Sequence, residues 1–249
     1  MSLINYYNYN GKNIGPPLTY SKLKGVMFFL PVSYSRAYEI TNKDGVSPIR
    51  ISPKKALLGL TFFDFIDCPV GPYREIALTI PVSLNYRYKP DIVPLLFQKS
   101  LSKYFALYTI MLGMNTLHGQ KHANKIFGYP VYNNLLNIDF VYNNRDINVS
   151  VRDNGNDILI FKNNINKKFK KYKRSYQTIF HADDGVKLVN LSATTVESST
   201  YMDKLTNFQL GEHSIANKIK DLEPSMFSLQ TSFYQNAVET LSNPENIKI

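Results

Sequence analysis

The stretch GPYREIALTIPV, residues 71–82, decides the fold predicted from this sequence. Gly71 and Pro72 favour a turn, and the β-branched and apolar residues after them favour a strand from Tyr73 to Val82. Successive side chains of a strand point to opposite faces. The alternation therefore places Tyr73, Glu75, Ala77 and Thr79 on one face and Arg74, Ile76, Leu78 and Ile80 on the other.

Short apolar runs recur along the chain, which indicates a mainly β protein with some α structure. Helices are expected at residues 33–40 and, with the clearest helical spacing, at 104–125. The chain is expected to end in a helix or loop. No linker rich in Pro and Ser divides it, so we expect one domain over residues 1–249, with an N-terminal arm over residues 1–20. Further strands are predicted at residues 26–30, 57–66, 94–97, 136–142, 147–151, 158–161, 175–180, 186–195 and 205–211.

The composition is that of a globular protein, with 44% hydrophobic and 19% charged residues. No apolar run reaches the ~18 residues of a membrane span, and no signal-peptide pattern opens the chain. We therefore expect a cytoplasmic protein with no membrane partner. The single cysteine, Cys68, excludes an internal disulfide and is expected to be a small buried residue.

The formal net charge of +10 comes largely from one basic stretch, Lys162–Arg174. Phe169 and Tyr172 lie among its lysines, a mixture that suits single-stranded nucleic acid. The asparagines in the same stretch favour an exposed hairpin tip instead. We expect a solvated loop, and binding of nucleic acid is the less favoured alternative.

Three stretches in order resemble the acetoacetate decarboxylase family: GPYREI with the strand that follows (residues 71–82), KIFGYP (125–130) and FQLGEH (208–213). The resemblance spans about two thirds of the chain. It implies a closed, cone-like antiparallel β-barrel with an internal cavity and a few helices. It also implies a small keto or hydroxy acid as substrate, no cofactor, and a homo-oligomer.

The resemblance fails at the residues that would perform the family's chemistry. In that family one lysine, activated by a neighbouring cation, forms an imine with the ketone. Burial and the adjacent charge keep its amine neutral enough to attack. The matching positions after Gly128-Tyr129-Pro130 are Val131 and Tyr132, neither of which forms an imine.

Glu75 is the leading catalytic candidate, because the resemblance places a cavity carboxylate there. A carboxylate aimed into an apolar barrel has a raised pKa and serves as an acid or base. The alternative is an exposed glutamate paired with Arg74 or a lysine. Arg74 itself points to the opposite face, where it is either structural or a ligand for a substrate carboxylate.

The remaining candidates lie around the Gly-Tyr-Pro step. Tyr132 is a candidate to hydrogen-bond a substrate carbonyl in catalysis, and Tyr73, Tyr129 and Val131 are candidates to bind substrate, although packing is the default for each tyrosine. Lys125 is a candidate for a relocated imine-forming lysine, and its alternative is a solvated residue near a helix C-terminus.

Three histidines have other expected roles. His118 and His122 have the i, i+4 spacing of zinc ligands, but no third ligand is evident, so no metal is expected. His213 is expected to fix a turn.

The sequence thus predicts a lyase-like enzyme, with dehydratase or isomerase chemistry also possible, in which Glu75 transfers protons without an imine. A binding protein without turnover and a decarboxylase with a relocated lysine are the alternatives.

Overall fold

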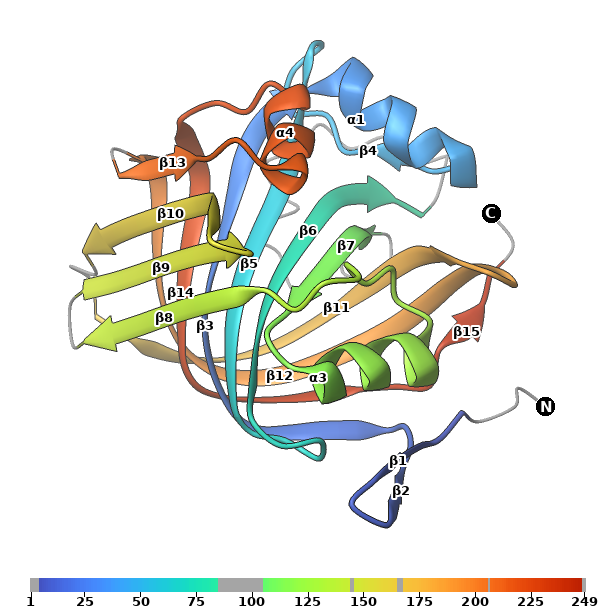
Figure 1. The fold of residues 1–249 in the computed structure, drawn as a ribbon. Coiled ribbons are helices and arrows are strands. Elements are labelled where there is room, and N and C mark those ends of the chain that lie inside the picture. Colours follow the sequence, from blue (N-terminus) through green and yellow to red (C-terminus); the bar gives the residue numbers. More distant parts are fainter. Residues whose placement is uncertain (1–4, 85–104, 144–145, 165–167, 206, 248–249) are drawn as a thin grey trace.

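The computed structural model describes residues 5–84, 105–143, 146–164, 168–205 and 207–247. Within these residues, seven long strands close into a barrel (Figure 1). Their order around the barrel is β7-β6-β5-β3-β14-β12-β11. The strands are β3 (Leu18–Ser33), β5 (Lys55–Asp67), β6 (Tyr73–Ser83), β7 (Phe105–Met114), β11 (Lys170–Ala182), β12 (Gly185–Lys204) and β14 (Phe227–Leu241).

The barrel is antiparallel except at one junction, where β11 runs parallel to β7 through Thr178 and Ile179. Strands β11 and β12 pair from Lys170 with Glu197 to Ala182 with Gly185, and this hairpin completes the ring. The closed antiparallel barrel expected from the sequence is confirmed, with this parallel contact as a local difference. Closure leaves the paired strands without the exposed edges of an open sheet.

A second, four-stranded sheet packs on one side of the barrel (Figure 1). Asn154 and Gly155 both have positive φ angles and form the tight turn between β9 and β10. The N-terminal residues form a hairpin, β1–β2, and the arm expected over residues 1–20 ends inside β3. The small strands are β1 (Tyr7–Tyr9), β2 (Lys12–Ile14), β4 (Ser47–Pro48), β8 (Asn137–Asn143), β9 (Asp146–Asp153), β10 (Asn156–Asn164), β13 (Phe208–Leu210) and β15 (Glu245–Asn246).

The helices are short, and within the described residues none has the length and apolarity needed to cross a membrane. Thr116 caps α3 by accepting a 3.1 Å hydrogen bond from the Gly119 amide. His213 caps α4 by accepting a 3.2 Å bond from the Ile215 amide, which fits the expected turn-fixing role. The helices are α1 (Tyr34–Thr41), the 3-10 turn η1 (Asn42–Asp44), α3 (Leu117–His122), the π-helix η3 (Ala123–Phe127) and α4 (Ser214–Asp221).

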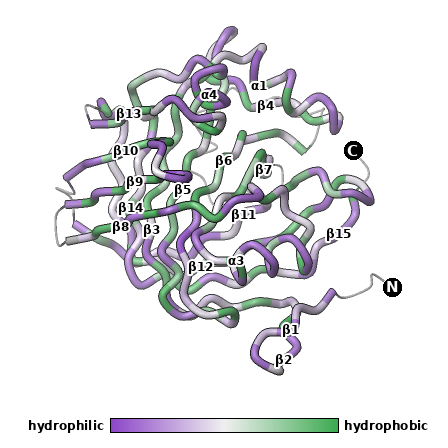
Figure 2. The backbone as a smooth tube through the Cα atoms, viewed as in Figure 1, coloured by the Kyte–Doolittle hydropathy of each residue, from purple (hydrophilic) through white to green (hydrophobic). Residues whose placement is uncertain are grey.

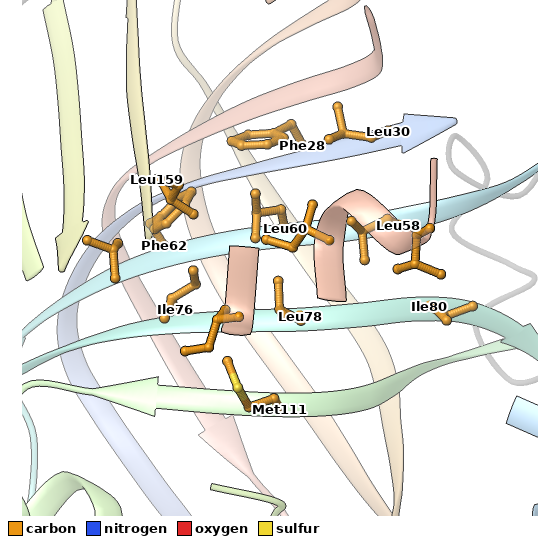
Figure 3. Packing of buried hydrophobic residues seen from close by; sticks show 14 of the residues in the cluster. Phe28, Leu30, Leu58, Leu60, Phe62, Ile76, Leu78, Ile80, Met111 and Leu159 are labelled. Atoms are coloured by element: carbon orange, nitrogen blue, oxygen red, sulfur yellow. The ribbon is translucent and has the colours of Figure 1, made fainter. Parts of the chain in front are cut away.

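The two faces of the barrel strands have different partners. Apolar side chains on the outer face, including Phe28, Leu60 and Ile76, pack against the small sheet through Leu159 (Figure 3). Figure 2 shows the hydrophobic residues that run along β6 and β7, whereas the β1–β2 hairpin is more hydrophilic. Because side chains alternate, the inner face of the same strands is left to line the barrel interior.

Three sequence expectations were wrong. The basic stretch was expected as a solvated loop, but Lys162 lies on β10 and residues 170–174 lie on β11. Residues 105–114 form strand β7 and not the first half of a helix, and only residues 117–127 are helical. Strand β7 is paired on both sides and mostly buried, so its continuous apolar run hides the strand periodicity. The chain after residue 211 contains helix α4 but also the 15-residue strand β14. The strand expected at 94–97 lies outside the described residues.

Candidate functional site

A cavity of about 80 Å³ lies inside the barrel, beneath α3 and η3. Its volume is several times the space that one water molecule needs. The four residues predicted to share one face of β6, namely Tyr73, Glu75, Ala77 and Thr79, all line it. The lining residues are Tyr20, Met27, Thr61, Phe63, Phe65, Tyr73, Glu75, Ala77, Thr79, Leu107, Thr109, Leu112, His122, Ala123, Phe127, Tyr129, Tyr176, Thr178, Leu191, Glu239 and Leu241.

Glu75 projects from β6 into this cavity with 8% of its surface exposed. Within the described residues its carboxyl group has neither an ion-pair partner nor a side-chain hydrogen bond. Burial, and then the negative charge of Glu239, raise the pKa of Glu75 to about 8. Glu75 therefore holds a proton at neutral pH and is available to donate it.

Glu239 is a second buried carboxyl group that the sequence reasoning missed. It lies on β14, where it pairs with Tyr20 on β3 and Ala193 on β12. Tyr176 donates a 2.6 Å hydrogen bond to its Oε1. Burial raises the pKa of Glu239 to about 7, while the bond from Tyr176 acts in the opposite direction. The cavity thus holds two carboxyl groups that change charge close to neutral pH.

A chain of hydrogen bonds borders the cavity beside Glu75. His122 Nδ1 lies 3.2 Å from the His118 carbonyl oxygen, so Nδ1 carries the ring proton and Nε2 is the acceptor. Tyr20 donates to this Nε2 over 2.9 Å. Burial lowers the pKa of His122 to about 4, which keeps the ring neutral.

The Gly-Tyr-Pro corner brings only its tyrosine to the cavity. Gly128 ends η3 with a φ of 81°, a conformation that glycine adopts without strain. Tyr129 then lines the cavity, and its hydroxyl lies 2.7 Å from Thr178 Oγ1. Val131 is partly buried against the same apolar cluster as Tyr129 but does not line the cavity.

Tyr132 points away from the cavity. Its hydroxyl donates a 2.7 Å hydrogen bond to Asp153 Oδ2, beside His213. Side chains alternate along an extended segment, so Tyr129 and Tyr132 face opposite sides. The structure therefore does not bring Tyr132 together with Glu75.

The cationic candidates also lie elsewhere. Lys125 is exposed on η3. Arg74 forms an ion pair with Asp64 at 3.3 Å and donates a 2.8 Å hydrogen bond to the Ile138 carbonyl, on the opposite face from Glu75. Within the described residues, the cavity lining contains no lysine and no arginine.

The two helical histidines use their ring nitrogens in hydrogen bonds. His118 Nδ1 lies 2.7 Å from the Tyr7 hydroxyl, and both nitrogens of His122 are engaged. The described residues contain no group of three or more His, Cys, Asp or Glu side chains placed to hold a metal. Cys68 is half-buried, and its thiol donates to the Gly71 carbonyl within the turn between β5 and β6.

No protein-family model and no curated protein matches the sequence. Several solved structures have a similar fold. An acetoacetate decarboxylase from Legionella pneumophila matches with a TM-score of 0.62 and 15% identity, over 99% of this chain and 90% of that one. A second acetoacetate decarboxylase matches at 0.61 and 14%, over 93% and 89%. The enduracididine biosynthesis enzyme MppR in complex with pyruvate matches at 0.59 and 9%, over 93% and 91%.

Proposed function

Since this chain has the acetoacetate decarboxylase fold, we propose that it is an enzyme in which Glu75 transfers a proton on a small keto or hydroxy compound, without an imine-forming lysine. The observation that carries the proposal is the carboxyl group of Glu75, which is buried in the barrel cavity and has no ion-pair partner among the described residues. A strongly perturbed carboxyl group in a cavity is typical of general acid–base catalysis. The keto and hydroxy acids expected from the sequence belong to this substrate class.

The second carboxyl group suggests how the reaction runs. In an elimination, protonated Glu75 gives its proton to the departing hydroxyl group, which leaves as water. The Glu239 carboxylate takes the proton from the neighbouring carbon, and the electrons of that C–H bond form the new double bond. Two carboxyl groups with different environments supply the acid and the base of such a step. An isomerisation uses the same two groups in sequence.

The main alternative is a binding protein on the same fold. It would be favoured if Glu75 lay outside the cavity or were held in an ion pair. Glu75 lines the cavity and has no ion-pair partner among the described residues, which supports the enzyme.

A cytoplasmic location, a single domain and a homo-oligomer remain predictions. Tyr73 and Tyr129 line the cavity and stay in the proposed site. Four other candidates lie outside the lining, which argues against direct roles for them: Tyr132, Lys125, Arg74 and Val131.

The test is deuterium exchange and product formation in D₂O, followed by NMR, with small keto and hydroxy acids and their amino-bearing analogues. We expect exchange or elimination by the wild type and a loss of roughly 10²-fold or more in Glu75→Gln. Glu212→Gln is the matched control, because the Glu212 side chain is 87% exposed. An unchanged rate in Glu75→Gln would remove Glu75 from the mechanism.

Borohydride trapping tests the other half of the proposal. A lysine that condenses with a ketone is reduced to a stable adduct, which mass spectrometry detects anywhere in the chain. We expect no mass increase with any ketone that is turned over. An adduct would establish an imine mechanism in place of the proposed one.

A further inference from the structure

The cavity contains two buried carboxyl groups with oxygen atoms that accept no side-chain hydrogen bond among the described residues. Glu75 offers two carboxyl oxygens without a side-chain hydrogen bond among the described residues, and it is more than nine-tenths buried. Glu239 is 4% exposed and offers its second oxygen. Buried acceptors without partners are costly, so a ligand that brings donors or positive charge is favoured there.

Three tyrosine hydroxyls of the lining already have hydrogen-bond partners. Tyr20 donates to His122, and Tyr176 donates to Glu239. The Tyr129 hydroxyl is paired with Thr178. A substrate carboxylate would have to break one of these bonds to use these hydroxyls, and ionisation of Glu75 or Glu239 beside it would repel it.

Positive charge is also missing from the described lining. His122, the one basic side chain there, is held neutral by burial. Arg174 lines an adjoining pocket that shares Tyr176 and Glu239 with the cavity. Its guanidinium group is bound by both oxygens of Glu197, at 2.9 and 3.1 Å. A buried anion without a counter-charge is strongly disfavoured.

One wall of the cavity is a continuous run of aromatic rings. The ring centroids of Phe63 and Phe65 are 5.4 Å apart, those of Tyr20 and Phe65 4.8 Å, and those of Phe65 and Tyr73 4.5 Å. Faces of aromatic rings attract cations, and walls of this kind bind ammonium groups. The aromatic rings and the carboxylates of this small cavity therefore both favour a positively charged ligand.

We propose that the cavity binds a small organic cation, whose ammonium group lies between Glu75 and Glu239 and against the aromatic wall formed by Tyr20, Phe63, Phe65 and Tyr73. This inference deepens the proposed function by naming the charge of the substrate, and it rests on that function for the site at Glu75. The substrate is then an amine that carries the keto or hydroxyl group, and a free carboxylate is not the group that the cavity recognises.

Binding of such a cation is coupled to release of a proton. The empty site holds a proton on Glu75 at neutral pH because the raised pKa favours the neutral acid. An ammonium group favours the carboxylate and displaces that proton. The other groups that face Glu75 do not titrate near neutral pH, apart from Glu239. These facing groups are Glu239 from β14, Tyr73 from β6, Tyr20 from β3, Tyr176 from β11, His122 from α3 and Tyr129 after η3.

Isothermal titration calorimetry of the full chain compares three probes: tetramethylammonium, the neutral tert-butanol of similar shape, and pyruvate. We expect tetramethylammonium to bind at least about tenfold more tightly than either of the others. Titrations at pH 7 in two buffers of different ionisation enthalpy should show release of about one proton per cation. The affinity should rise by up to about tenfold between pH 6 and 7.

Variants assign the effect to the cavity. Glu75→Gln and Glu239→Gln should each weaken tetramethylammonium binding by about tenfold or more, while Glu212→Gln should leave it unchanged. Tighter binding of pyruvate than of tetramethylammonium by the wild type would overturn the inference, and this comparison needs no variant to fold. The binding measurement does not depend on turnover. An unchanged exchange rate in Glu75→Gln would contradict the proposed function, whereas tighter binding of pyruvate than of tetramethylammonium would contradict the cation site.

Discussion

Glu75 on β6 and Glu239 on β14 line one cavity, although two strands, β5 and β3, lie between theirs in the barrel sheet. The curvature of the closed barrel brings their side chains together. Each carboxyl group is buried, and the charge on Glu239 adds to the raised pKa of Glu75. Two acidic groups that would repel one another in their charged forms therefore share a small apolar interior, an arrangement that costs folding free energy at alkaline pH.

The first prediction concerns the pH dependence of stability. Folded Glu75 and Glu239 keep their protons to about pH 8 and 7, whereas unfolded glutamates release them near pH 4.5. The folded state then binds more protons than the unfolded state, so the free energy of unfolding falls as pH rises from about 4.5 to 8. Urea denaturation should show that Glu75→Gln removes a decline on the order of a few kcal/mol across this window.

The control for that prediction is Glu212→Gln, which should keep the wild-type dependence because Glu212 is exposed. Comparing the two variants cancels the contributions of the other titrating groups. A Glu75→Gln variant that loses stability with pH as steeply as the wild type would show that Glu75 ionises normally in the folded chain.

The second prediction separates Tyr132 from the active site. Tyr132→Phe removes the donor of the 2.7 Å hydrogen bond to Asp153, a residue that is 4% exposed. Asn134 and His213 remain as partners of the same oxygen. We expect a loss of about 1–3 kcal/mol in the free energy of unfolding and turnover within about twofold of the wild type.

Tyr129→Phe is the comparison, because Tyr129 lines the cavity and should affect turnover more strongly than Tyr132 does. Both changes remove one phenolic hydroxyl. If Tyr132→Phe abolished turnover while its unfolding curve stayed unchanged, the placement of Tyr132 outside the site would be wrong.

The sequence was sufficient to identify the part of the site that lies on a regular strand. Residues 73–79 alternate without interruption, so spacing placed Glu75 on one face with Tyr73, Ala77 and Thr79, and the resemblance indicated that this face points into the cavity. Strand β14 could not be treated in this way. Its register to β3 shifts between Tyr234 and Ala237 and again before Glu239, so its burial pattern does not follow a period of two.

The failure at residues 105–114 has a related cause. Apolar residues fill both faces of β7 because one face packs in the core and the other lines the cavity. A run of this kind has no clear strand period and resembles a buried helix. The orientation of Tyr132 was a different problem, because nothing in a short corner shows from sequence which of Val131 and Tyr132 faces inward.

The third prediction concerns the ion pair beside the cavity. The Glu197 side chain is 1% exposed and depends on Arg174 for its counter-charge. Arg174→Met leaves a buried carboxylate that keeps hydrogen bonds from the Ser199 and Thr195 hydroxyls but loses its counter-charge, so we expect a loss of about 3–5 kcal/mol in the free energy of unfolding. The double variant Arg174→Met with Glu197→Leu should recover part of this loss. A double variant that is less stable than Arg174→Met alone would contradict that account.

The fourth prediction explains the glycine in the FQLGEH stretch. A Cβ atom on Gly211 would lie 1.9 Å from the Asp157 carbonyl oxygen, a contact that backbone on both sides must move to relieve. The Gly211 amide also donates a 2.9 Å hydrogen bond to the Ile158 carbonyl, so movement would break the join between β13 and β10. We expect Gly211→Ala to cost about 3 kcal/mol by urea denaturation. Gly155→Ala is the matched control. Gly155 has a φ of 84°, but an added Cβ there would meet no atom within 4 Å, so we expect only the conformational cost of about 1 kcal/mol in the free energy of unfolding. Equal losses in the two variants would mean that close backbone approach is not what requires glycine at position 211.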